Sequence, residues 1–95
     1  MLNKLRDECY YNAKLKGFHD TPREFGTAIA LIHSELSEAL EADREGDWDM
    51  VCEEFADVLI RLFDTAGEYR IDLDRAVERK MKINAGRQRK HGKEY

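Results

Sequence analysis

The sequence is poor in residues that interrupt helices, with one proline and six glycines among its 95 residues. Folds built from strands and turns need more of these residues, so they are disfavoured. The two cysteines, Cys9 and Cys52, form neither a disulfide framework nor a zinc-knuckle spacing, which is typical of a reducing cytoplasm. No apolar run approaches the roughly 18 residues of a membrane span. We therefore expect one mostly helical, cytoplasmic domain without a membrane segment.

Charge is divided unevenly along the chain. Residues 1–78 carry 9 Lys and Arg against 19 Asp and Glu, whereas residues 79–95 carry 7 against one. The basic C-terminal arm, residues 79–95, could bind nucleic acid or phosphate, or extend into solvent. An acidic body with a basic arm is unusual for a nucleic-acid binder. The combination fits a metal ion together with an anionic ligand, so nucleic acid is not expected as a partner.

Hydrophobic periodicity predicts four helices in a single domain of residues 1–95. The second helix is expected to begin at Thr21 as N-cap, with Pro22 at its first position and Glu24 as the capping-box partner. Asp47 and Asp72 are the expected caps of the third and fourth helices. The expected spans are residues 2–16, 21–45, 47–70 and 72–84. The predicted fold is all-α, with helical hairpins forming a four-helix bundle that oligomerisation completes, because the first and fourth helices are short.

Two acidic pairs occupy matching places on the second and third helices. At about 100° per residue, Glu35 and Glu38 fall on one flank of the second helix's apolar face. Glu54 and Asp57 fall on the corresponding flank of the third helix. A short turn at Gly46 makes the two helices antiparallel, which places residue 35 level with 57 and residue 38 level with 54. The spacing therefore predicts that four carboxylates converge on one patch.

Four clustered carboxylates repel one another unless they hold protons or cations. Hard oxygen ligands without neighbouring His or Cys favour Mg²⁺, with Mn²⁺ or Ca²⁺ as alternatives. Glu35 shares a heptad row with Ala28 and Ala42, so burial is expected to raise its pKa. The competing interpretation is a solvated acidic face, with Asp57 in an ordinary ion pair to Arg61 one turn further along.

The acidic motifs also carry a family resemblance. E-x-x-E, 15 residues and then E-x-x-D, followed by Lys80, Asn84, Arg87 and His91-Gly92-Lys93, resemble the signature of the MazG-like, all-α nucleoside triphosphate pyrophosphohydrolases. The similarity covers roughly residues 18–95, through ALIHSELSEALEADREGD, CEEFADVLIRLFDTAGEYRIDLDRAV and KMKINAGRQRKHGKEY. One departure is Gln88 after Arg87, where many relatives have proline.

The resemblance implies a homodimer or homotetramer that cleaves a nucleoside triphosphate between the α and β phosphates. The products would be a nucleoside monophosphate and pyrophosphate. The implied ligands of the Mg²⁺ ions are Glu35, Glu38, Glu54 and Asp57.

Roles within such a reaction can be assigned to individual residues. Because its pKa is expected to be raised, Glu35 is the first candidate for the general base that activates water, and Glu38 is the second. The loop before the second helix offers an aromatic ring and an imidazole as base contacts, Phe18 and His19. Two cations and an amide follow i, i+4, i+7 spacing and would share one face for phosphate oxygens if the fourth helix continued to Arg87, namely Lys80, Asn84 and Arg87.

An alternative of another class is a non-catalytic helical dimer whose basic arm binds nucleic acid or a protein. This alternative predicts no nucleotide turnover and an affinity that falls steeply with salt. A ferritin-like di-iron centre requires Glu-x-x-His, which the sequence lacks.

Overall fold

The computed structural model describes residues 1–87, and this part of the chain consists of four helices without a strand. The all-α prediction is therefore confirmed. Residues 88–95, which include the His91-Gly92-Lys93 motif, lie outside the described residues. Within residues 1–87, no helix combines the length and apolar character needed to cross a membrane. The helices are α1 (Leu2–Leu15), α2 (Phe25–Arg44), α3 (Trp48–Glu68) and α4 (Leu73–Ala85).

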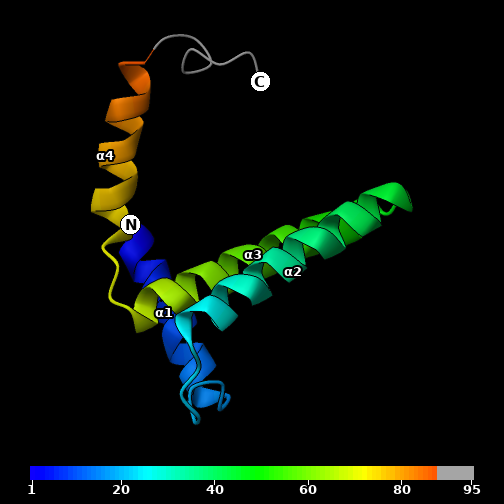
Figure 1. Ribbon diagram of the computed structural model, residues 1–95, viewed down its shortest axis with the longest axis horizontal. Helices are drawn as coiled ribbons and strands as arrows, with labels where there is room; N and C mark the ends of the chain where they lie inside the picture. Colours follow the sequence, from blue (N-terminus) through cyan, green and yellow to red (C-terminus); the bar gives the residue numbers. More distant parts are fainter. Residues whose placement is uncertain (88–95) are drawn as a thin grey trace.

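The helices α2 and α3 form a long antiparallel hairpin (Figure 1). Gly46 makes the turn possible because its φ of +76° lies in the left-handed region, which side chains with a Cβ disfavour. The carboxylate of Asp47 then accepts a hydrogen bond of 3.1 Å from the Met50 backbone N–H, so the predicted cap of α3 is confirmed.

Small residues fill the seam between the two helices of the hairpin. Four of the seven buried apolar residues are alanines, and small side chains let neighbouring helix backbones approach closely. A second apolar flank stays open in the single chain, with exposures of 41–58% for Leu36, Leu40, Phe55, Leu59 and Leu62. The buried apolar residues are Ala28, Ile32, Ala39, Ala42, Val51, Phe63 and Ala66.

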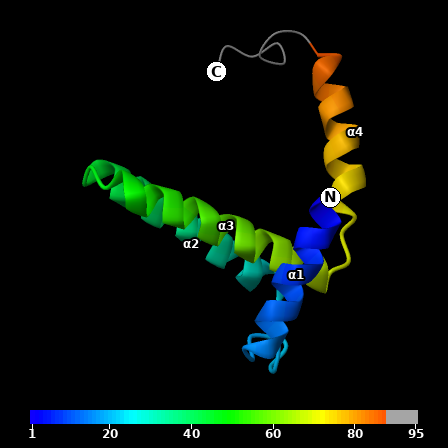
Figure 2. The ribbon, with the colours of Figure 1, turned by 180° about the vertical axis from the view of Figure 1, so that it is seen from behind.

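The first helix packs across α3 near the C-terminal end of that helix (Figure 2). Gly67 on α3 permits this contact, because a Cβ built there would lie 2.6 Å from the Tyr10 Cβ. The hairpin projects beyond α1 and α4, and the radius of gyration is 15.8 Å against about 12 Å for a compact chain of this length.

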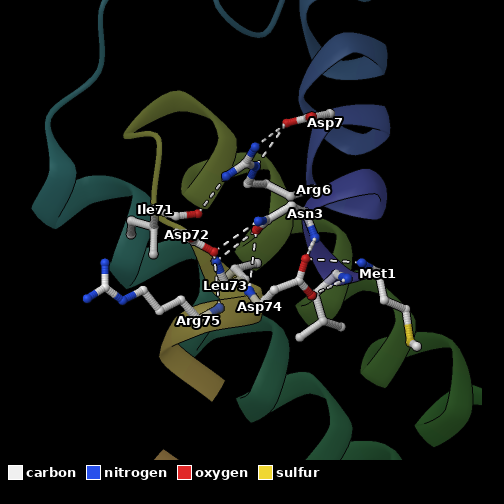
Figure 3. A network of polar contacts seen from close by, with 10 residues as sticks. Met1, Asn3, Arg6, Asp7, Ile71, Asp72, Leu73, Asp74 and Arg75 are labelled. Carbon is white, nitrogen blue, oxygen red and sulfur yellow. Dashed lines mark hydrogen bonds and ion pairs between the residues drawn. The ribbon is translucent and has the colours of Figure 1, made fainter. Parts of the chain in front are cut away.

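The helices α1 and α4 cap each other where their N-termini meet. The Asp74 carboxylate accepts hydrogen bonds from the backbone N–H groups of Leu2 at 2.7 Å and Asn3 at 3.3 Å (Figure 3). In return, the Asn3 Oδ1 atom accepts one of 2.8 Å from the Leu73 N–H. The predicted cap of α4 is also present, since Asp72 accepts from the Arg75 N–H at 3.1 Å. Both helix ends thereby satisfy N–H groups that have no partner within the helix.

The predicted start of α2 at Thr21 is wrong. This helix begins at Phe25, and Glu24 precedes it in an extended conformation without a side-chain capping bond. The reason is a tertiary contact, because the Arg23 guanidinium forms an ion pair of 3.1 Å with Asp64 on α3. That ion pair holds the segment before the helix against α3, and the predicted capping box does not form.

We predict that Gly67→Ala destabilises the fold, whereas Gly26→Ala on α2 stabilises it. The new methyl group at position 67 would collide with Tyr10 and push α1 away, at a cost of about 1–3 kcal/mol. At position 26 nothing lies within 4 Å of the added Cβ, so the better helix propensity should contribute about 0.5–1 kcal/mol. Urea denaturation measures both free energies of unfolding. Equal effects of the two substitutions would contradict the close approach of α1.

Candidate metal centre and adjoining cavity

The α2–α3 hairpin brings three glutamates together. Glu35, Glu38 and Glu54 each offer one carboxylate oxygen, and these oxygens lie within 4.8 Å of one another. Two of these side chains come from α2 and one from α3, which agrees with the antiparallel register predicted around Gly46. We call these residues the three-carboxylate group.

Asp57, the fourth predicted member, lies beside this group and outside it. Its side chain is one carbon shorter than glutamate, and it faces the same cavity as Glu35. Arg61 was the predicted ion-pair partner of Asp57 in the competing interpretation. Its Nε atom instead donates a hydrogen bond of 2.9 Å to the Glu35 Oε1 atom. Arg61 therefore neutralises part of the three-carboxylate group itself.

Glu54 is the buried member of the group, with 8% of its surface exposed. Its Oε2 atom is inaccessible to solvent and has no hydrogen-bond partner. A buried carboxylate oxygen without a partner is costly, so such an atom indicates a missing proton or cation. The donor set of three carboxylates fits a hard divalent cation such as Mg²⁺ or Mn²⁺.

Because Glu35 and Glu54 lie close together, their pKa values shift in opposite directions. Hydrogen bonding to Glu35, burial and the negative charge of Glu38 raise the pKa of Glu54 to about 7. The pKa of Glu35 is lowered, first by its hydrogen bond to Glu54 and then by Arg61. The expectation of a raised pKa at Glu35 is therefore wrong, because the more deeply buried Glu54 is the member of the pair whose pKa is raised.

A cavity of about 630 Å³ lies beside the three-carboxylate group, between α1 and the hairpin. This volume is within the range of about 300–1,000 Å³ typical of small-molecule sites. Four acidic residues line it, Glu35 and Asp57 beside the three-carboxylate group and Glu8 and Asp64 elsewhere on its wall. The remaining lining residues combine an aromatic ring, three cations, an amide and further side chains of α1, α3 and the α1–α2 loop: Leu5, Cys9, Asn12, Ala13, Lys16, Phe18, Arg23, Ile60 and Arg61.

The site predicted from the sequence includes no residue of α1, although α1 lines this cavity. Asn12 and Lys16 lie one helical turn apart, next to the apolar positions Cys9 and Ala13 of the same helix. Polar residues that border an apolar stripe at helical spacing are the signal that could have indicated them.

The α1–α2 loop places its two predicted base contacts differently. Phe18 lies at the cavity with 65% of its surface exposed. The ring of His19 lies between two carboxylates of α3, with its Nε2 atom 2.6 Å from Asp64 and its Nδ1 atom 3.2 Å from Glu68. His19 therefore anchors the loop to α3, and its contact with a base stays a prediction.

The predicted phosphate-binding residues lie on α4 or beyond it. Lys80 and Asn84 are on the helix, but α4 ends at Ala85 and Gly86 follows as its C-cap. Arg87 is therefore past the helix end, so the condition that α4 continues to Arg87 is not met and the three residues do not share one helical face. Within residues 1–87, no α4 side chain lines the 630 Å³ cavity, and Lys80 instead lines a groove along α4. Their contact with phosphates stays a prediction.

Comparisons of the chain with protein-family models, with curated proteins and with solved structures found no match. The observations that bear on function are therefore the site itself and the motifs of the sequence. Together they define a helical protein with a carboxylate centre beside a ligand-sized cavity.

The raised pKa of Glu54 predicts a specific dependence of stability on pH. The folded state keeps this proton up to about pH 7, whereas a carboxyl with the ordinary pKa of 4.5 loses it earlier. Between these values the folded state binds more protons than the unfolded state, so this group's contribution to stability falls as pH rises. Without divalent cations, Glu54→Gln should reduce the loss of stability between pH 5 and pH 8.

Urea denaturation at the two pH values, in the presence of a chelator, measures this difference. Glu53→Gln is the matched control, because Glu53 is the exposed neighbour on the same helix. If Glu54→Gln changed the free energy of unfolding with pH as the wild type does, the proton would not reside on Glu54.

Proposed function

We propose that this protein is a Mg²⁺-dependent nucleoside triphosphate pyrophosphohydrolase. It would cleave a ribo- or deoxyribonucleoside triphosphate between the α and β phosphates. The observation that carries the proposal is the three-carboxylate group at the edge of a cavity lined by Lys16, Arg23 and Arg61. Acidic ligands for metal beside cations for phosphate are what hydrolysis of a triphosphate requires. The resemblance of the acidic and basic motifs to MazG-like enzymes supports the same reaction.

The metal would be held by Glu35, Glu38 and Glu54, with Asp57 able to join from the cavity wall. Mg²⁺, or Mn²⁺ in its place, would neutralise the triphosphate and lower the pKa of bound water. The partnerless Oε2 atom of Glu54 and the oxygen-only donor set fit such an ion.

The general base is better assigned to Glu38 than to Glu35. The Glu35 side chain is only 13% exposed, so water reaches its carboxylate less readily. Glu38 is exposed, so water reaches its carboxylate directly. In this assignment Glu38 takes the proton from the water that attacks the α-phosphorus.

The cavity would hold the nucleoside with its phosphates toward the three-carboxylate group. Phe18 offers an aromatic face to the base, and Lys16 offers a positive charge from the C-cap position of α1. Lys80, Asn84 and Arg87 would add phosphate contacts if α4 of a neighbouring copy reached the cavity.

We expect pyrophosphate and a nucleoside monophosphate from at least one triphosphate, only with Mg²⁺ or Mn²⁺ present. In water labelled with oxygen-18, the label should enter the monophosphate, because the attack is at the α-phosphorus. Glu38→Gln should lower kcat/KM by about 100-fold or more. Glu41→Gln is the matched control, an exposed glutamate on the same helix outside the three-carboxylate group.

Orthophosphate and a diphosphate as products would refute cleavage between the α and β phosphates. Absence of turnover, together with salt-dependent binding of nucleic acid, would favour the non-catalytic alternative.

We also propose a homodimer or homotetramer in which hairpins pair through their open apolar flank. Leu36, Leu40, Phe55, Leu59 and Leu62 are too exposed for a lone chain, and pairing two hairpins into a four-helix bundle would bury them. The extended shape of the single chain supports this assembly.

Sedimentation equilibrium at micromolar concentration should therefore give at least twice the chain mass of 11.1 kDa. Leu59→Glu should lower the mass toward that of a monomer, because it places a charge in the paired flank. Leu15→Glu is the control, since Leu15 is equally apolar but lies on α1, away from the flank. A wild-type mass of 11.1 kDa would exclude the assembly.

A further inference from the structure

Arg61 joins the three-carboxylate group to the cavity. It is on α3, one turn after Asp57, and its Nε atom lies 2.9 Å from the Glu35 Oε1 atom. The Glu35 side chain is 13% exposed, and the Arg61 side chain is 39% exposed. Both residues line the 630 Å³ cavity. The guanidinium is therefore bound to a candidate metal ligand while it retains access to the space beside that ligand.

A divalent cation and this guanidinium would compete for Glu35. A metal ion lies about 2.0–2.6 Å from its carboxylate oxygens, which would bring two positive charges to the same carboxylate. Like charges at such a short distance repel strongly in a partly buried site. Binding of a cation to the group would therefore displace Arg61 from Glu35.

The cavity offers Arg61 a second position. A long, partly exposed side chain can turn into it without a change of backbone. Arg23 also lines the cavity, but it is held by Asp64 at 3.1 Å and by Glu68 at 3.6 Å. Arg61 differs from Arg23 because its partner, Glu35, is one of the proposed metal ligands. Its planar fork of N–H donors suits the oxygens of a phosphate.

We propose that Arg61 is an exchangeable counter-ion of the three-carboxylate group and the phosphate-binding residue that the metal releases. Without metal it neutralises Glu35. When a divalent cation takes Glu35, Arg61 turns into the cavity and binds phosphate oxygens. The inference rests on the proposed function and assigns to this site an order of binding, metal first and phosphate second. Each ligand then strengthens the binding of the other.

The test is Arg61→Gln, which keeps much of the length and removes the charge. Mn²⁺ is titrated into the metal-free protein, and the free ion is followed by electron paramagnetic resonance. Loss of the competing charge should tighten Mn²⁺ binding by about 10-fold. Pyrophosphate is then titrated at saturating Mn²⁺ by calorimetry, and its binding should weaken by about 10-fold. Opposite signs for the two ligands are not expected from a merely structural role.

Arg44→Gln is the matched control, because it removes the same charge at the far end of α2. It should change neither affinity by more than about twofold, well below typical coupling factors. Arg61→Lys keeps the charge, so its affinities for Mn²⁺ and for pyrophosphate should fall between those of the wild type and Arg61→Gln. This variant also tests the inference if Arg61→Gln does not fold.

The outcomes separate the inference from the proposed function. Equal Mn²⁺ affinity in the wild type and Arg61→Gln would overturn the exchange and leave the metal centre intact. Unchanged pyrophosphate affinity would overturn the phosphate-binding role. No Mn²⁺ binding by either protein would overturn both the inference and the proposed metal-dependent reaction.

Discussion

Carboxylates that face one another across two packed helices must be neutralised, and this constraint governs the centre of the molecule. The three glutamates meet because they lie on facing sides of the α2–α3 hairpin, on either side of the turn at Gly46. The repulsion raises the pKa of Glu54, and the Arg61 guanidinium neutralises Glu35. In the proposed function, a bound divalent cation would take over this neutralising role.

The same hairpin explains why the single chain is extended. Alanines bring the backbones together but bury little apolar area, so larger side chains remain on the outer flank. Among residues 1–87, no large hydrophobic side chain is fully buried. A short α1 covers one end of the hairpin, and α4 turns away from it. Assembly through the outer flank would leave the three-carboxylate group and its cavity on the other side of each hairpin.

The features that were predictable from the sequence are those that depend on local spacing. Helical periodicity located the four helices, and the symmetry of the motifs around Gly46 brought together the three glutamates. Thr21 failed as a cap because Arg23 makes a tertiary contact with Asp64. The acidity of Glu35 was misjudged for a similar reason, since it depends on which neighbours the folded chain supplies. The cavity could not be predicted from local spacing because α1 forms one of its walls. The position of α1 depends on contacts between residues that are far apart in the sequence.

This division between local and distant contacts also bears on the order of folding. The hairpin closes through residues that are symmetric about a short turn, whereas α1 and its loop are fixed by pairs such as His19 and Asp64, 45 positions apart. Short loops close faster than long ones, so we expect the hairpin to form first. The three glutamates would then be forced together before α1 docks, and their repulsion would be felt in the folding transition state. The divalent cation of the proposed function would consequently speed the folding of this chain, in addition to slowing its unfolding.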